Sequence, residues 1–154
     1  MSEIVLQQAS VGDPAVRALI DLHLRDMHAL SPAESVHARG ADALDDPAVE
    51  LWAAWDGAVL AGIGALAALD DARGELKSMR VADEYRGRGV GRRILRHLVE
   101  RAAGRGMTSL WLETGSAPAF APARGLYVSE GFAFCDPFAP YVPDPHSVFL
   151  TRQV

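Results

Sequence analysis

The 154-residue sequence contains one cysteine, one lysine and no long apolar run. Because Cys135 has no partner, an internal disulfide and a cysteine-based zinc site are excluded. No apolar stretch approaches the roughly 20 residues of a membrane-spanning helix. The first ten residues, MSEIVLQQAS, lack the basic and apolar regions of a signal peptide. The five histidines show no metal-ligand spacing. These absences predict a cytoplasmic protein with no membrane partner and no metal.

Positive charge is also scarce overall, but it is concentrated in one segment. The net charge of −5 argues against general nucleic-acid binding. Residues 80–105 nevertheless hold eight arginines and three acidic residues, so this segment carries +5 and the rest of the chain −10. A solvated basic helix face is one explanation. The arginines surround a glycine turn, however, and this favours a local anion site.

The apolar patterns predict one α/β domain over residues 1–154. Alternation and short apolar runs indicate strands, and a 3.6-residue repeat indicates helices. Asp13 and Pro14 are residue types that commonly begin a helix, and Asp56-Gly57 predicts a hairpin turn. Residues 31–47 are expected to form a loop with a helical turn. The expected order is β-α-β-β-β-α-β-α-β-β, a mixed sheet of about seven strands with flanking helices. The expected segments are 3–9, 14–30, 49–55, 58–69, 75–81, 90–103, 108–114, 123–131, 132–135 and 147–153.

The glycine turn at Gly87, Gly89 and Gly91 lies between a strand and a helix. Glycines in this position let backbone N–H groups converge on an anion, and the helix N-terminus adds about half a positive charge. Neighbouring arginines offer bidentate phosphate contacts. A dinucleotide fingerprint would need a third glycine where Arg92 stands, and an ATP-binding loop would need Gly-Lys followed by Ser or Thr, whereas the only lysine is Lys77. The turn therefore fits neither nucleotide motif.

Two blocks together resemble the GNAT superfamily of acetyl-coenzyme A-dependent N-acetyltransferases. The family motif Gln/Arg-x-x-Gly-x-Gly/Ala is matched by Arg86, Gly89 and Gly91. A second block, Leu-Tyr-x-x-x-Gly-Phe, begins at Leu126-Tyr127 and ends at Gly131-Phe132. The segments LKSMRV, LETG, FAPARGLY and DPHSVFL look like a subgroup of small bacterial members with poorly defined substrates. The resemblance implies a single GNAT fold that uses acetyl-CoA as cosubstrate.

The resemblance also implies where the coenzyme lies. The turn would hold the pyrophosphate, and the strand before it would part from its parallel neighbour, Leu110–Thr114, so that the pantetheine arm adds as an extra strand. A backbone N–H near Met79 or Val81 would polarise the thioester carbonyl. At Phe120 the family often has an asparagine, which puts that coenzyme contact in doubt. The expected coenzyme-binding residues are Met79, Arg80, Val81, Arg86, Gly87, Arg88, Gly89, Val90, Gly91 and Arg92.

Two residues are candidates for the chemistry. Glu75 lies six residues before Val81, the offset of the catalytic glutamate in histone-acetylating relatives, and an amine with a pKa of ~10.4 needs a base. Its structural alternative is a carboxylate paired with Lys77 or an arginine. Tyr127 matches the family tyrosine that faces the coenzyme sulfur and protonates it. Its alternative is a core tyrosine whose hydroxyl is satisfied elsewhere.

The acceptor pocket of the family lies near the first helix and the following loop. His23 and Ser35 belong to a polar cluster there, although such residues are more often surface groups. Glu113 and Thr114 end the parting strand and either face the acceptor or cap the next helix. The acidic remainder of the chain favours a cationic acceptor. The expected substrate-binding residues are His28, Glu34, His37, Glu113 and Thr114.

The leading hypothesis is transfer of an acetyl group from acetyl-CoA to a primary amine of a small or amino acid-like molecule, by direct attack in a ternary complex. Alternatives are an acyl-CoA-binding or sensing module with little turnover, and an acetyltransferase for a protein amine. A toxin-like enzyme acting on aminoacyl-tRNA would call for a broader basic surface. The resemblance also implies a homodimer, because GNAT proteins often pair through their last strands, and the apolar segment SVFLTRQV is expected to contribute to a sheet edge.

Overall fold

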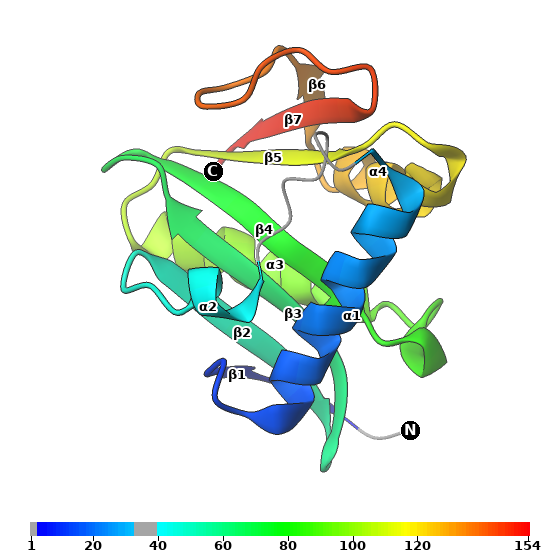
Figure 1. Cartoon of the computed structure of the whole chain (residues 1–154). Helices are drawn as coiled ribbons and strands as arrows, with labels where there is room; N and C mark the ends of the chain where they lie inside the picture. The colour runs from blue at the N-terminus through cyan, green and yellow to red at the C-terminus, as the bar shows by residue number, and fades with distance from the viewer. Residues whose placement is uncertain (1–2, 33–39) are drawn as a thin grey trace.

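A computed structural model describes residues 3–32 and 40–154. Seven strands form one sheet in the order β1-β2-β3-β4-β5-β7-β6 (Figure 1). All neighbouring pairs are antiparallel except β4 and β5, which are parallel. The strands are β1 (Ile4–Gln8), β2 (Val49–Asp56), β3 (Val59–Ala68), β4 (Arg73–Val81), β5 (Ser109–Gly115), β6 (Ala133–Cys135) and β7 (Ser147–Gln153). The helices are α1 (Pro14–Leu30), α2 (Ala41–Leu44), α3 (Val90–Gly104) and α4 (Ala121–Ser129), with short 3₁₀ turns at Asp83–Tyr85 and Pro118–Phe120.

Helices cover both faces of this sheet, with α1 and α3 on opposite sides (Figure 1). Val16, Leu19 and Ile20 of α1 belong to one apolar cluster, and the inner face of α3 belongs to a second, larger one. β3 lies between the two layers, and this explains its nearly continuous apolar sequence. Gly64 lets α3 approach the sheet, because a Cβ there would lie 2.7 Å from Ile94 Cγ2. Burial on both faces therefore fixes the position of β3 and of its neighbour β4.

The predicted order of elements is confirmed, with shifts at some ends. α1 begins at Pro14 as expected, since the Asp13 side chain accepts hydrogen bonds from the N–H groups of Ala15 and Val16. β4 starts at Arg73, two residues early, because Asp70 closes a tighter turn through the N–H groups of Ala72 and Arg73. α2 provides the helical turn expected between residues 31 and 47.

The strand β7 lies between β5 and β6, so its expected position at a sheet edge is wrong. The three-residue strand β6 pairs with Phe149–Thr151 and takes the edge instead. The sequence could not show this, because β6 and β7 have similar apolar character. The homodimer stays a prediction.

The parallel pair β4 and β5 is short. It runs from Arg73 opposite Ser109 to Leu76 opposite Leu112 and then ends. Beyond that point β4 continues along β3 to Val81, whereas β5 continues along β7 to Gly115. The predicted parting of these two strands is thus confirmed, and each side of the gap is held by a different neighbour.

A β-bulge interrupts β4 at the start of this gap. Ser78 has a φ of 54°, and Ser78 and Met79 together oppose the single residue Gly64 of β3. The extra residue places Lys77 and Arg80 on the same face of the strand, although they are three positions apart. Met79 packs into the apolar cluster of α3, whereas Arg80 contacts Asp26 on α1. The bulge therefore turns two cationic side chains toward α1.

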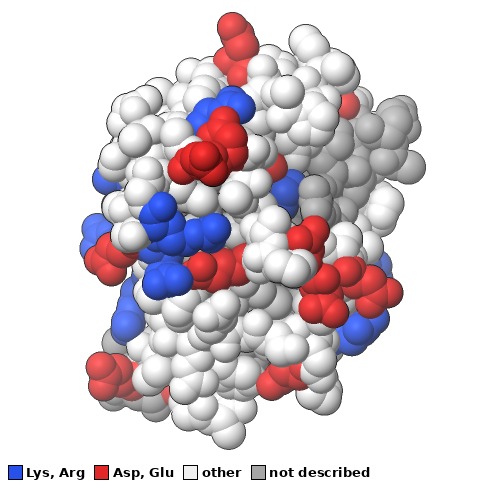
Figure 2. Space-filling view, turned by 90° about the vertical axis from the view of Figure 1, so that its left-hand side faces the viewer, with Lys and Arg blue, Asp and Glu red and all other residues white. Residues whose placement is uncertain are grey.

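The arginines of the basic segment are largely paired once the chain is folded. Arg101 and Arg105 contact Glu50, and Arg96 contacts Glu130. Acidic and basic side chains are interspersed on the face shown in Figure 2. The excess positive charge of this segment is therefore largely offset by ion pairs with carboxylates in the folded chain. Among residues 3–32 and 40–154, no helix combines the length and apolar character that crossing a membrane requires.

Candidate active site

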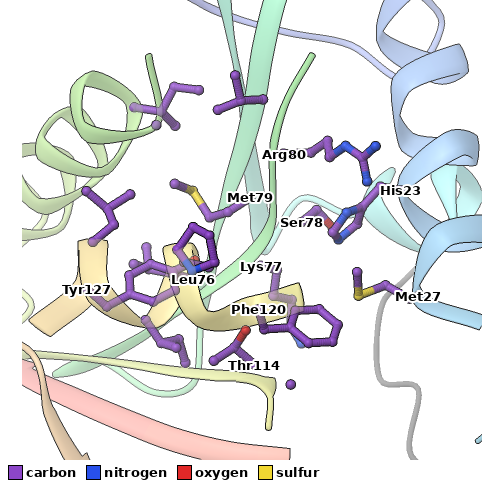
Figure 3. A pocket seen from close by; sticks show the side chains of 18 of the residues that line it. His23, Met27, Leu76, Lys77, Ser78, Met79, Arg80, Thr114, Phe120 and Tyr127 are labelled. Carbon is purple, nitrogen blue, oxygen red and sulfur yellow. The ribbon is translucent and has the colours of Figure 1, made fainter. Parts of the chain in front are cut away.

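A cleft of about 690 Å³ occupies the gap between β4 and β5. It is lined from α1, from the second half of β4, from the glycine turn and the start of α3, from the end of β5, from α4 and from the segment between β6 and β7. Figure 3 shows side chains of β4 between those of α4 on one side and those of α1 on the other. One cleft thus joins the glycine turn to the α1 side of the sheet.

The glycine turn forms the end of the cleft nearest α3. Gly87 and Gly89 have φ values of 77° and 79°, a region that glycine adopts without steric cost. Gly89 is the N-cap of α3 and, having no side chain, supplies no capping hydrogen bond. A Cβ on either glycine would meet nothing within 4 Å. The first backbone N–H groups of α3 therefore have no capping side chain from Gly89, and anion binding by this turn stays a prediction.

All the residues expected to bind coenzyme line this cleft except Arg88. The Arg88 guanidinium lies 5.1 Å from the centre of the Tyr85 ring instead. Arg86 pairs with Asp83 at 3.0 Å, and Arg92 pairs with Glu130 at 2.8 Å. These arginines are thus partly engaged by carboxylates, and their role toward coenzyme stays a prediction.

Tyr127 reaches the cleft from α4 and is only 6% exposed. Its ring packs edge-on against Phe132, with centroids 5.8 Å apart. Burial raises the pKa of the hydroxyl well above its usual value, so the phenol keeps its proton at neutral pH. It lies near Met79 and Leu76 in Figure 3. This position suits a proton donor to a group lying in the strand gap.

Glu75 also lines the cleft, on the α1 side, and is 4% exposed. Its Oε2 atom contacts Lys77 Nζ at 2.9 Å and accepts a hydrogen bond of 2.6 Å from the Tyr141 hydroxyl. The pairing with Lys77 is the structural alternative considered for this residue. Both contacts involve Oε2, so neither of them uses Oε1. The role of Glu75 as base stays a prediction.

The expected acceptor residues are divided by the structure. Glu113 and Thr114 line the cleft. His28 is exposed and lies outside the lining, which is a correction: His23 and Met27 occupy the α1 face that turns toward the cleft, and His28 lies on another face. Glu34 and His37 fall outside the described residues.

Sequence reasoning missed three contributors to the acceptor side. Lys77 lies two positions after Glu75 and therefore on the same face of β4, so its place depends on which face of the strand meets α1. Tyr141 and His146 come from the segment before β7, and their position depends on tertiary packing. Tyr141 packs edge-on against Phe138 with centroids 5.0 Å apart, and its hydroxyl reaches Glu75. Over the part of the chain that the structure describes, no cluster of three or more His, Cys, Asp or Glu residues could hold a metal.

A family model described as the acetyltransferase (GNAT) family matches residues 16–132. The chain belongs to the GNAT acetyltransferase family. Two relatives described as uncharacterized N-acetyltransferases are YsnE of Bacillus subtilis, 48% identical over 90% of this chain and 92% of its own, and YedL of Escherichia coli, 50% identical over 90% and 87%. An IAA acetyltransferase of Azospirillum brasilense is 35% identical over the full length of both chains.

Solved structures of GNAT proteins share the fold. A candidate acyl-CoA N-acyltransferase of Klebsiella pneumoniae is 26% identical, covers 97% of each chain and has a TM-score of 0.80. A GNAT acetyltransferase of Elizabethkingia anophelis with acetyl-CoA bound is 19% identical, covers all of both chains and has a TM-score of 0.70. This chain is therefore an acetyltransferase by family, and it shares the fold of these solved GNAT structures.

One residue of the cleft departs from the common family pattern. Phe120 stands where GNAT proteins often have asparagine, and it is buried against β5. A side chain at Gly115 would clash with the Phe120 ring. Gly115 and Phe120 thus form a matched apolar contact at the mouth of the strand gap.

Proposed function

We propose that this GNAT protein transfers an acetyl group from acetyl-CoA to a primary amine of a small or amino acid-like molecule, by direct attack in a ternary complex. The observation that carries the proposal is the parting of β4 and β5 after Leu76 and Leu112, with a glycine turn at the end of β4. An extended amide-bearing ligand fits an unpaired strand edge, and its phosphates fit the start of α3.

The cleft supports direct attack because it joins two regions on opposite faces of β4. Tyr127 lies on the α4 side, where a departing thiolate would receive a proton. Glu75 lies on the α1 side with Tyr141 and Lys77, where an incoming amine would lose one. Acetyl-CoA supplies the activated acyl group, and the protein supplies position, a base and an acid.

Release of free thiol from acetyl-CoA tests the proposal. The panel contains small amines, the standard amino acids, IAA and a lysine-containing peptide, since the relatives' descriptions do not agree on one acceptor. Thiol release that requires a primary amine, with an N-acetylated product seen by mass spectrometry, supports it. Tight binding of acetyl-CoA without release on any acceptor would make the protein a sensing module instead. Preference for the peptide would favour a protein amine.

Glu75→Gln should lower kcat by about 10²–10⁴-fold, the contribution of a positioned general base. The change keeps the side chain's size but removes the proton acceptor, and the loss should shrink at high pH because more of the amine is already neutral. Steady-state kinetics from pH 6 to pH 10 measure this. Glu50→Gln is the control, since Glu50 is also a strand carboxylate held by ion pairs, with Arg101 and Arg105, but none of these residues lines the cleft. An unchanged pH–rate profile would place the base elsewhere.

A further inference from the structure

Three side-chain atoms in the cleft are buried without a hydrogen-bond partner among the described residues. They are His23 Nδ1, Ser78 Oγ and Arg80 Nε. All three residues line the cleft. In Figure 3 the His23 ring lies beside Ser78, with Arg80 next to them. Buried polar groups are normally paired, so three unpaired ones at one place indicate a ligand contact.

The fold brings these atoms together through two features described above. The bulge places Ser78 in its left-handed conformation and turns Arg80 toward α1. Arg80 is 9% exposed, and its Nη2 atom is held by Asp26 at 2.7 Å. That ion pair fixes the guanidinium while Nε remains unpaired. A non-glycine residue with positive φ costs conformational free energy, and such strained residues are found mainly at functional sites. Here the strained residue lies beside a fixed cation.

The chemistry of the three atoms selects the ligand group. Arg80 Nε can only donate a hydrogen bond, and the Ser78 hydroxyl can donate one as well. Burial, followed by the charge of Arg80, lowers the pKa of His23 to about 4, so its ring is neutral at pH 7 and can carry its single proton on Nδ1. A group with several lone pairs can accept hydrogen bonds from all three atoms, whereas an ammonium group could not pair with Arg80 Nε and would be repelled by the guanidinium charge.

We infer that His23, Ser78 and Arg80 bind the carboxylate of the acetyl acceptor, which makes the acceptor an α-amino acid. This inference rests on the proposed function for the identity of the reacting amine. A carboxylate accepts hydrogen bonds on both oxygens and forms stronger bonds to arginine than a neutral carbonyl does. Ser78 directly precedes Met79, where the thioester is expected, so the carboxylate lies close to the reacting amine. An α-amino acid has one carbon between these groups.

The inference replaces the cationic acceptor suggested by composition. The charge of −10 outside the basic segment is spread over the chain and does not describe the cleft. The acceptor side holds two buried cations: Lys77 is paired with Glu75, and Arg80 is paired with Asp26 at 2.7 Å and with Asp83 at 3.6 Å. The local balance there is set by these pairs, and the remaining polar atoms favour an oxygen ligand.

Matched acceptors provide the first test. The standard L-amino acids are compared as free acids, as carboxamides and as the corresponding decarboxylated amines, with thiol release as readout. The free acid of the preferred amino acid should have a kcat/KM at least about tenfold above its carboxamide and its amine, the loss expected for a hydrogen bond to a charged group. Equal or better use of the amide or the amine would overturn the inference.

Variants provide the second test. Ser78→Ala and His23→Phe should raise the KM for the amino acid about tenfold or more, leave the KM for acetyl-CoA unchanged and reduce the preference for acid over amide. His23→Asn should recover part of the loss, because its amide can donate from a similar position. Ser147→Ala is the control, since Ser147 Oγ is also buried and unpaired among the described residues but lies outside the cleft lining. Equal effects of Ser78→Ala and Ser147→Ala would overturn the inference.

Calorimetry separates failure of this inference from failure of the proposed function. The amino acids, amides and amines are titrated into protein saturated with coenzyme A, which needs no turnover. Carboxylate-dependent binding without thiol release supports the subsite and refutes the proposed function. Acetylation of amines without carboxylate preference refutes the subsite alone. Absence of both refutes both.

Discussion

Gly89→Asp should raise the Kd of acetyl-CoA by roughly a hundredfold or more, as expected when about two hydrogen bonds to a charged group are lost. Gly89 is the N-cap of α3 with a φ of 79°, and a Cβ there would meet no atom within 4 Å. A carboxylate at this position would itself occupy the open N–H groups and would repel a pyrophosphate. Titration calorimetry on the folded variant measures the effect.

Two further substitutions separate charge from backbone strain. Gly89→Asn has nearly the same shape without the charge and should weaken binding only a few-fold. Gly106→Asp adds a carboxylate at another glycine with positive φ, 81°, beyond the opposite end of α3, and should leave the Kd unchanged. Gly91→Asp should also weaken binding but is less clean, because a Cβ there would contact Leu126 at 3.3 Å. Wild-type affinity in both the Asp and the Asn variant at position 89 would exclude a pyrophosphate site there.

Tyr127→Phe should lower kcat by about a hundredfold while acetyl-CoA affinity and the melting temperature hardly change. The ring keeps its packing against Phe132, and no hydrogen bond of the hydroxyl occurs among the described residues, so little stability depends on it. What is lost is the proton for the departing thiolate. Kinetics, calorimetry and thermal unfolding on the same preparation measure the three quantities.

The pH dependence gives an independent check on this role. Burial raises the pKa of Tyr127, so the acid stays protonated beyond pH 10, where an exposed tyrosine begins to ionise. The wild-type rate should therefore not fall through ionisation of Tyr127 at any pH up to 10. Over this range its pH profile should have the same shape as that of Tyr127→Phe. Full turnover in the variant, or a decline near pH 9 that disappears with the hydroxyl, would remove Tyr127 from the chemistry.

The order of elements was predictable because most of them carry strong local signals. Asp13-Pro14 marks the start of α1, Asp56-Gly57 marks the turn between β2 and β3, and the glycine turn marks the start of α3. The end of the cleft at the glycine turn followed from the same signals, since it is built from one continuous segment, Met79 to Arg92; its role toward coenzyme stays a prediction. Local patterns are sufficient where a site is local in the chain.

The acceptor side was harder because it is assembled from distant segments. The choice of His28 over His23 depended on which face of α1 meets the sheet, and packing decides this. The bulge at Ser78 places a serine in a conformation that favours glycine, so no residue type in the sequence indicates it. Tyr141 reaches Glu75 across 66 positions of the chain.

The strand β7 has a consequence for how GNAT proteins of this kind can diverge. It holds β5 up to Gly115, on the far side of the strand gap, yet none of its residues lines the cleft. It also lies beyond residue 132, where the family match ends. Mutations in β7 can therefore tilt β5 and change the width of the gap while every residue in contact with the ligands stays the same. Related enzymes can then come to differ in ligand preference through a segment that touches neither coenzyme nor acceptor.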